Sequence, residues 1–454
     1  MPKLNDALLL PCGARLANRL AKAAITEGLA DERGWPSAEL ERLYEGWSDA
    51  GFGLMISGNI IIDANHLERP GNVVIERDNP AQAKSLRSWT ACATRGGAHF
   101  WAQLSHSGRQ TPKTVNRYPL SVSNVQMGLP SVLFGKPLAM TVGEIHLVIE
   151  KFAAAAAVCK ATGFTGVQIH AAHGYLLGSF LAPNVNNRTD PWGGPLENRA
   201  RLLLEVVAAT RKRVGRNFPI SVKLNSADFQ RGGFNRQDSL MVGRWLEAAG
   251  VDLLEISGGS YESPVMIGAT GVGADCEPPL KPSTAAREAY FFEFARALRQ
   301  ELKIPVMLTG GLRSRSGMQA ALDEGVDMLG VARPVCVDQR CVRGLLSGEI
   351  DRLESWEVNL RRAKGLFSSN SPLPLLGVLA NFAGIYWFYA QLNRLGKGKA
   401  PDIRLWPPRA MVEVTMAENA NLARRRRFQQ SEAALVADKP TLERIARAMS
   451  KKAA

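Results

Sequence analysis

Two histidines and a tyrosine lie close together in the stretch QIHAAHGYLL, at His170, His173 and Tyr175. The chain has only six histidines, so two within four residues is a concentration that needs an explanation. A neutral imidazole offers one hydrogen-bond donor and one acceptor, and a phenol can give up a proton. These residues suit metal ligation, general acid–base chemistry or the binding of a charged oxygen. Their position on a helix or at a strand end decides between these roles.

Metal binding is the weakest of the three interpretations. Zinc and iron centres need three or four ligands, and the spacing H-x-x-H supplies two. Asp190 is the only acid close by in the sequence, and the six cysteines form no CxxC pair. We therefore expect no metal at this position and reduced thiols at the cysteines. A purely structural role, with both histidines capping a loop, remains open.

Short apolar runs rich in β-branched residues alternate with longer stretches of helical periodicity through the first three-quarters of the chain. The expected strands are 20–26, 53–57, 98–104, 166–170, 220–224, 252–256, 305–309 and 327–331. The clearest expected helices are 37–51, 81–97, 142–163 and 196–215. Eight such strands, separated by helical segments and helix-ending glycines, indicate a (β/α)8 TIM barrel. An open doubly wound sheet is the alternative, but its GxGxxG turn is missing.

Two parts of the chain follow from this pattern. We expect the barrel to occupy residues 1–345 and a partly helical C-terminal extension to occupy 346–454. Catalytic groups of such barrels lie at the C-terminal ends of the strands. Polar residues and glycines recur at these ends in the sequence, at Thr26, Gly58, Gln103, His170, Lys223, Ser257 and Gly310. The recurrence predicts a site over the barrel mouth.

The stretches TGGLRS and VARP follow the seventh and eighth expected strands. They present Gly310, Gly311 and Arg333 where barrels often bind phosphate. Tight turns are the simpler explanation of the glycines, but the position favours phosphate. Gln103 and Lys223 add an amide and a positive charge, which together suit a ring that becomes anionic, such as a reduced flavin.

The chain of 454 residues carries a net charge of +14 at pH 7. Its basic residues are scattered apart from the run RRRR at 424–427, and no basic platform with interleaved aromatics is evident. We therefore expect no nucleic-acid partner. A basic surface that attracts phosphorylated small molecules fits the charge better.

The segment between Lys364 and Arg394 has no charged residue and could just span a bilayer. Asn381 and Gln391 within it favour a buried helix, so we do not expect membrane contact. Its aromatic residues could cover the substrate pocket, although packing in the core is the commoner use of such residues. They are Tyr386, Trp387 and Tyr389. The N-terminal stretch MPKLNDALLLPCG shows no secretory pattern, so we expect a cytoplasmic location.

Four stretches carry a resemblance to a known family: NRLAKAAITEG, AQLSHSGRQ, VQIHAAHGYLLGSFLAPNVNNRTDPWGGPLENRARL and GVDMLGVARP. In order and spacing they resemble the Old Yellow Enzyme family of FMN-dependent NAD(P)H oxidoreductases, from about residue 8 to 345. The third stretch is the most specific. The resemblance implies FMN as the cofactor and NAD(P)H as the reductant.

The resemblance also implies roles for particular residues. The FMN would be surrounded by Thr26, Asn59, Gln103, Lys223, Gly310, Gly311, Ala332 and Arg333. His170 and His173 would hydrogen-bond the oxygen of a bound carbonyl or phenolate, and Tyr175 would donate the proton. The chain departs from the family pattern in reading Ala24-Ile25 in place of Pro-Met, and in carrying Lys223 where many members have Arg. These changes concern the flavin potential and the packing of its ring.

The expected reaction is passage of a hydride from NAD(P)H via FMN to an α,β-unsaturated carbonyl compound. The alternatives are an NAD(P)H oxidase or a non-catalytic flavin-binding barrel, with membrane association as a further option. Self-association into a homo-oligomer is left open. The natural substrate and the preference between NADH and NADPH cannot be read from the residues.

Overall fold

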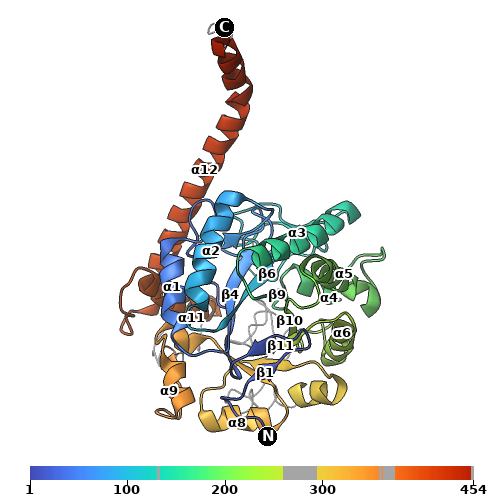
Figure 1. The fold of residues 1–454 in the computed structure, drawn as a ribbon. Helices are drawn as coiled ribbons and strands as arrows, with labels where there is room; N and C mark the ends of the chain where they lie inside the picture. Colours follow the sequence, from blue (N-terminus) through green and yellow to red (C-terminus); the bar gives the residue numbers. More distant parts are fainter. Residues whose placement is uncertain (130–132, 259–293, 357–359, 361–373, 451–454) are drawn as a thin grey trace.

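The computed structural model describes residues 1–129, 133–258, 294–356, 360 and 374–450. Eight parallel strands form a closed barrel in these residues (Figure 1). They are β3 (Leu20–Lys22), β4 (Leu54–Ile61), β6 (His99–Ser105), β9 (Gly166–Ala171), β10 (Ile220–Asn225), β11 (Leu253–Ser257), β12 (Val306–Thr309) and β13 (Met328–Val331). Pairing of β3 with both β13 and β4 closes the ring.

The predicted (β/α)8 fold and its eight strands are confirmed. The first strand is shorter than expected, because it ends at Lys22 and not at Thr26. After Lys22 the chain crosses the barrel rim toward β4, where the Cα of Thr26 lies so near Gly58 that a side chain at Gly58 would collide with it. This crossing replaces the strand pairing that was expected to continue from Lys22 to Thr26.

The interior of the barrel has an apolar lower layer. A hairpin of β1 (Leu8–Leu9) and β2 (Arg15–Leu16) packs against the starts of the barrel strands. The buried cluster comprises Leu8, Leu10, Leu16, Ala21, Ala23, Leu54, Ile56, Trp101, Leu253, Met307 and Met328. Several of these are the first residues of their strands, so the hairpin closes the end of the barrel opposite the expected site.

Helices surround the barrel on the outside (Figure 1). They are α1 (Ala38–Ser48), α2 (Pro80–Thr94), α3 (Val142–Ala161), α5 (Leu196–Val214), α6 (Arg236–Ala248) and α8 (Arg315–Asp323). The four helices named from the sequence are confirmed as α1, α2, α3 and α5. Side-chain caps define the starts of α1, α2 and α3 at Ser37, Asn79 and Thr141, and Thr141 forms a capping box with Glu144.

Shorter elements lie in the connections. They are β5 (Val73–Val74), β7 (Leu120–Ser121), β8 (Leu138–Ala139), α4 (Leu176–Leu181), α9 (Cys341–Ser347) and the 3-10 turns η1 (Gly108–Gln110) and η3 (Arg333–Cys336). The boundary expected at residue 345 falls inside α9.

The C-terminal extension includes the helices α11 (Pro374–Gly396) and α12 (Pro407–Ser450), and α12 projects away from the barrel (Figure 1). Gln391 is fully buried and exchanges two hydrogen bonds with the backbone of Asp402, at 2.7 and 3.1 Å. Trp387 is also buried, and its indole N–H donates to the Leu405 carbonyl at 2.9 Å. Within the described residues, no helix is both long and apolar enough to cross a bilayer.

A buried cluster attaches this extension to the loop after β4. The Arg69 guanidinium lies 2.6 Å from the Glu418 carboxylate of α12 and 3.7 Å from the centre of the Tyr389 ring. Burial raises the pKa of the nearby Tyr386 to about 12 and also raises the pKa of Glu418. These aromatics therefore pack against α12 and the β4 loop.

We predict that Arg69→Met loosens α12, because it leaves the Glu418 carboxylate buried without its cation. The expected loss of unfolding free energy is about 3 kcal/mol. Hydrogen exchange should rise in the segment 407–425. The control Arg409→Met removes an exposed arginine of the same helix, whose pair with Glu413 is open to solvent and worth less than about 1 kcal/mol. Equal exchange in both variants would contradict the anchoring role.

Candidate active site

The structure brings His170, His173 and Tyr175 together at the C-terminal end of β9. The ring centres of His170 and His173 are 5.1 Å apart, and the Tyr175 ring lies 4.7 Å from that of His170. His170 points into the barrel from the penultimate residue of the strand. His173 and Gly174 follow with φ of 61° and 77°, so the chain makes a left-handed turn there. This turn places the His173 ring beside that of His170.

Neighbouring strand ends hold His173 in this conformation, which costs a non-glycine residue energy. The Asn225 side chain accepts from the His173 N–H at 3.3 Å, and the Gln110 amide donates to its carbonyl at 2.7 Å. The Ser257 hydroxyl is 2.7 Å from His173 Nε2. Three separate elements thus fix one histidine.

Tyr175 stands at the N-terminus of α4 and is only 4% exposed. The next residue, Leu176, donates its N–H to the carbonyl of His106 at 3.0 Å. The Ser179 hydroxyl donates to the Gly174 carbonyl at 2.8 Å. The loop after β6 and the first turn of α4 therefore hold the tyrosine beside His170.

Both histidines of the pair are neutral at physiological pH. Burial, together with His173 and Lys223, holds the pKa of His170 well below its ordinary value. Burial and Lys223 lower the pKa of His173 to about 3. His170 Nδ1 accepts the Ala172 N–H at 3.2 Å, so its single proton is on Nε2. His170 is therefore a hydrogen-bond donor through Nε2.

Three of the residues expected at the flavin lie side by side. Asn59 of β4 pairs in register with Gln103 of β6, past a bulge after Ile56. Thr26 lies against Gly58, where a Cβ atom would come within 2.2 Å of the Glu27 carboxylate and 2.4 Å of the Ile25 carbonyl. The Gly58 N–H donates to Glu27 at 2.9 Å. Only glycine allows this close approach.

The remaining expected flavin residues lie toward the ends of β12, β13 and β10. Gly310 and Gly311 follow β12 with φ of 149° and 68°, and Ala332 and Arg333 follow β13, the strand paired with β12. Lys223 projects from β10 and is 3% exposed. All eight residues thus lie at the mouth of the barrel, and their contact with FMN stays a prediction.

Two buried polar atoms at this mouth fit a bound polar molecule. Asn59 Oδ1 and Thr309 Oγ1 have no hydrogen-bond partner among the described residues. Buried polar atoms normally find partners. Together with the glycines after β12, which leave backbone amides open to close approach, these atoms suit a cofactor that carries both a polar ring and a phosphate.

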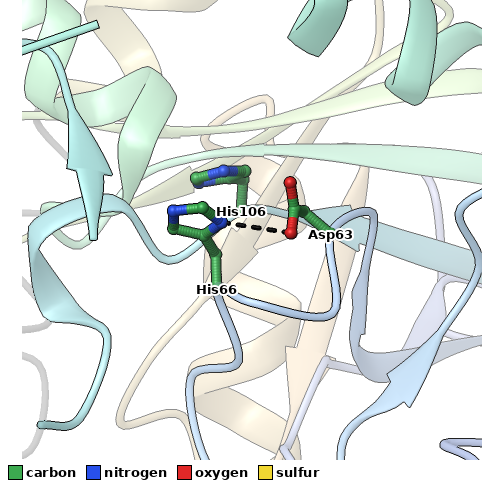
Figure 2. Close-up of side chains that lie close together, drawn as sticks. All are labelled: Asp63, His66 and His106. Atoms are coloured by element: carbon green, nitrogen blue, oxygen red, sulfur yellow. Dashed lines mark ion pairs between the residues drawn. The ribbon is translucent and has the colours of Figure 1, made fainter. Parts of the chain in front are cut away.

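A second cluster lies at the ends of β4 and β6 (Figure 2). Asp63, His66 and His106 place potential ligand atoms within 4.8 Å of one another. A metal ion would have to lie in both imidazole planes, but the rings are stacked at 4.2 Å with only 28° between their planes, which therefore meet far from the rings. The Lys151 ammonium already lies 2.6 Å from the Asp63 carboxylate.

We interpret this cluster as a polar network built on the ion pair of Asp63 with Lys151. His66 Nε2 accepts the Leu120 N–H at 2.9 Å, and its Nδ1 faces Asp63 at 3.2 Å. Although burial opposes it, His66 and Lys151 hold the pKa of Asp63 well below its ordinary value. Burial and His66 lower the pKa of His106. The network ties the loops after β4 and β6 to α3, behind the loop that carries Tyr175.

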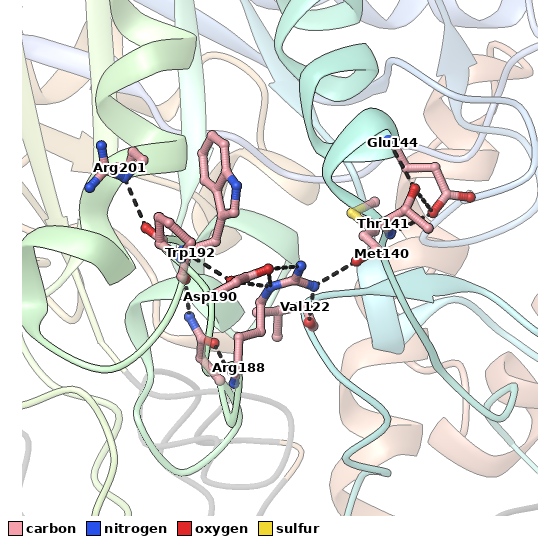
Figure 3. Close-up of polar contacts among 10 residues, drawn as sticks. Val122, Met140, Thr141, Glu144, Arg188, Asp190, Trp192 and Arg201 are labelled. Atoms are coloured by element: carbon pink, nitrogen blue, oxygen red, sulfur yellow. Dashed lines mark hydrogen bonds and ion pairs between the residues drawn. The ribbon is translucent and has the colours of Figure 1, made fainter.

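The motif NNRTDPWGG has a structural use (Figure 3). Arg188 donates to the carbonyls of Val122 and Met140 at 3.1 and 2.6 Å and to the Asp190 carboxylate at 3.0 Å. Asp190 in turn accepts the Trp192 N–H at 3.1 Å. The Arg188 side chain is 10% exposed. It fastens the segment after α4 to the long loop between β6 and α3.

Sequence reasoning gave no role to several residues of this region. Asn225 and Gln110 position His173, and two buried polar residues, Gln168 and Glu255, contact Gln103 and Lys223. The alternation of inward and outward residues in GVQIH and DLLEI is a signal that could have found Gln168 and Glu255, because it places both on the inner face.

We predict that Arg188→Met lowers the free energy of unfolding by about 2 kcal/mol, since two buried carbonyls and a carboxylate lose their donor. Urea unfolding measures this effect. Arg213→Met is the matched control, because Arg213 pairs with Glu150 on the exposed surface, and such pairs contribute less than about 1 kcal/mol. A loss no larger than that of the control would show that the fastening is dispensable.

Comparison with known proteins agrees with this architecture. Residues 13–349 match the model of the NADH:flavin oxidoreductase / NADH oxidase family. The NADH-dependent flavin oxidoreductase iccE of Talaromyces variabilis is 32% identical, over 87% of this chain and 98% of that protein. The corresponding protein iliE of a Neonectria species is 33% identical, over 73% of this chain but only 45% of its own length.

Among solved structures, an old yellow enzyme homologue from Zymomonas mobilis superposes with a TM-score of 0.65 at 25% identity, over 78% of this chain and 95% of that one. The family model covers most of the chain, and the relatives named for NADH and flavin are identical to it at about a third of the aligned positions. The chain therefore belongs to the NADH:flavin oxidoreductase / NADH oxidase family, the family of Old Yellow Enzyme, and is an FMN-dependent oxidoreductase with NAD(P)H as its reductant.

Proposed function

We propose that this oxidoreductase passes the hydride of NAD(P)H via FMN to an α,β-unsaturated carbonyl compound. The observation that carries the proposal is the grouping of two neutral imidazoles and a shielded phenol, His170, His173 and Tyr175, at the barrel mouth. FMN supplies the hydride chemistry when bound, and the protein supplies orientation and charge stabilisation.

His170 and His173 are proposed to hold the carbonyl oxygen of the substrate. Negative charge grows on this oxygen as the hydride reaches the β-carbon, and fixed donors stabilise that charge without reorganisation. The Ala172 N–H fixes the proton of His170 on Nε2, and Ser257 fixes the ring of His173. Loss of one such donor typically slows the reaction by about two to three orders of magnitude.

Tyr175 is proposed to give its proton to the α-carbon. A phenol hydroxyl can donate its proton. The residue is buried against the edge of the His170 ring, so bulk water does not compete for the same position. General acid catalysis of this kind contributes about two to four orders of magnitude.

The flavin is proposed to contact the residues that the sequence singled out at the strand ends. Gln103 and Lys223 would face the polar edge of its ring, with Thr26 and Asn59 alongside. Gly310, Gly311, Ala332 and Arg333 would hold its phosphate through backbone amides and a guanidinium. The Oδ1 atom of Asn59, which has no hydrogen-bond partner within the part of the chain that the structure describes, supports this assignment.

The alternative is an NAD(P)H oxidase that uses oxygen as its acceptor. One relative of Thermoanaerobacter brockii, 29% identical, is named NADH oxidase. Reduction of oxygen needs neither two hydrogen-bond donors for a carbonyl oxygen nor a proton donor beside them. The three strand and loop elements that hold His173 therefore favour a carbonyl substrate.

We predict that NADH reduces the flavin of Tyr175→Phe at the wild-type rate, whereas the variant reduces 2-cyclohexenone at least about 100-fold more slowly than the wild type. Only the second half-reaction needs the α-proton. Anaerobic stopped-flow absorbance separates the two half-reactions. Tyr118→Phe is the control, since Tyr118 is 59% exposed, and it should match the wild type. An undiminished enone reaction in Tyr175→Phe would refute the acid role.

The neutral histidines also predict how stability depends on pH. The pKa of His173 is about 3 when folded and about 6.5 when unfolded. Below pH 6.5 the unfolded chain therefore binds a proton that the folded protein does not, and stability falls with falling pH. Between pH 7 and pH 5 this residue should cost about 2 kcal/mol.

Urea unfolding at pH 7 and pH 5 tests this expectation. His173→Asn should lose less stability between the two values than the wild type does. The exposed His146 provides the control, and His146→Asn should follow the wild type. The same pH dependence in all three proteins would mean that His173 is not held neutral by the fold.

A further inference from the structure

Four buried polar side chains form a continuous chain of contacts across the barrel interior, from β6 to β11. The Gln103 amide donates to Gln168 at 2.7 Å, and the Gln168 amide donates to the Glu255 carboxylate at 2.7 Å. The other oxygen of Glu255 lies 2.8 Å from the Lys223 ammonium. Each of the four residues is at most 3% exposed. The chain joins the two residues expected at the polar edge of the flavin.

The charges of this chain are confined to one ion pair. Lys223 of β10 and Glu255 of β11 occupy paired positions in the sheet, and both project inward above the apolar layer. Their side chains are 4% and 0% exposed. At such positions charges interact far more strongly than at the surface. Any change of charge at the barrel mouth therefore interacts strongly with the charges of Lys223 and Glu255.

Glu255 also sets the orientation of both amides. A carboxylate only accepts hydrogen bonds, so Gln168 must turn its NH2 group toward it. The carbonyl oxygen of Gln168 then faces Gln103 and accepts from it. Gln103 has one of its N–H groups committed in this way, which fixes the positions of its carbonyl oxygen and second N–H. Glu255, acting through Gln168, thus determines which hydrogen-bond donor and acceptor Gln103 presents to the barrel mouth.

We propose that Glu255 is a positioning residue that sets the reduction potential of the bound flavin, acting through Lys223 and Gln103. This inference rests on the proposed placement of those two residues at the flavin ring. The reduced flavin becomes anionic, so a positive charge beside it favours reduction. Glu255 partly offsets the charge of Lys223 and therefore keeps the potential lower than Lys223 alone would set it.

The lower potential has a chemical purpose. A reduced cofactor of lower potential gives up its hydride more readily to an acceptor. Glu255 would thus make hydride transfer from NAD(P)H to the flavin less favourable and hydride transfer from the flavin to the substrate more favourable. A simple structural role for Glu255, as a counter-ion needed only for folding, makes no prediction about the direction of a potential shift.

The test is the two-electron reduction potential of the FMN-loaded protein, measured against a reference dye during slow anaerobic reduction. We expect Glu255→Gln to raise the ratio of binding constants for reduced and oxidised FMN at least tenfold, which is a positive shift of about 30 mV. Glu413→Gln is the matched control, because Glu413 lies on α12 and is exposed. The control should leave the potential unchanged.

Further variants keep the test decisive if Glu255→Gln does not retain FMN. Glu255→Asp keeps the charge and should stay closer to the wild-type potential than to that of Glu255→Gln. Lys223→Gln should shift the potential in the negative direction. The double variant Lys223→Gln/Glu255→Gln removes both charges, so its potential should fall between those of the two single variants.

An unchanged or more negative potential in Glu255→Gln overturns the proposal, and so does a double variant that lies outside the range of the single variants. Enone turnover by the wild type is scored separately. A wild-type protein that NADH reduces but that does not reduce enones refutes the proposed reaction and leaves the potentials to decide the role of Glu255.

Discussion

Closure of the barrel through the pairing of β3 with β4 is the constraint on which the site depends. A closed parallel sheet sends the C-terminal ends of all its strands to one rim, so residues far apart in sequence meet there. Within each strand the two-residue alternation puts Gln168 and His170, or Glu255 and Ser257, on the same inner face. The apolar lower layer then excludes water from beneath, and the polar layer above it faces the mouth.

This layering explains why the histidines need so much support. A neutral imidazole aimed into a buried mouth must be held by groups that are themselves fixed. His173 takes its support from β10, β11 and η1 through Asn225, Ser257 and Gln110. The polar network of Asp63, His66 and Lys151 stiffens the loops behind it. Precision at the site is thus distributed over several elements of the barrel.

Periodicity in the sequence was enough to predict the strands and the main helices, because burial of a closed parallel sheet leaves long apolar runs with clear helical partners. The position of His170 and Lys223 at strand ends followed from the same pattern. The early end of β3 and the bulge of β4 after Ile56 were not predictable, since both depend on the contact of Gly58 with Thr26 and Glu27. Such contacts between segments leave no periodic signal.

The C-terminal extension was predictable only in part. Its uncharged stretch indicated a helix, and α11 is one, but the attachment of Arg69 to Glu418 joins residues that lie 349 positions apart. The resemblance supplied the flavin and the proposed roles of Tyr175 and the histidine pair, whereas Gln168 and Glu255 emerged from side-chain contacts alone. Local sequence patterns therefore locate the ends of the strands. The partner of each residue at a strand end is determined by how the sheet closes, which the local sequence does not show.

The central claim is that an unsaturated carbonyl compound is the acceptor of this enzyme. The most direct test reduces the FMN-loaded protein with one equivalent of NADH without oxygen, then adds 2-cyclohexenone and follows the flavin absorbance. The account predicts that the yellow colour returns with formation of an equal amount of cyclohexanone. A flavin that stays bleached with the enone and regains its colour only when oxygen is admitted would contradict the account.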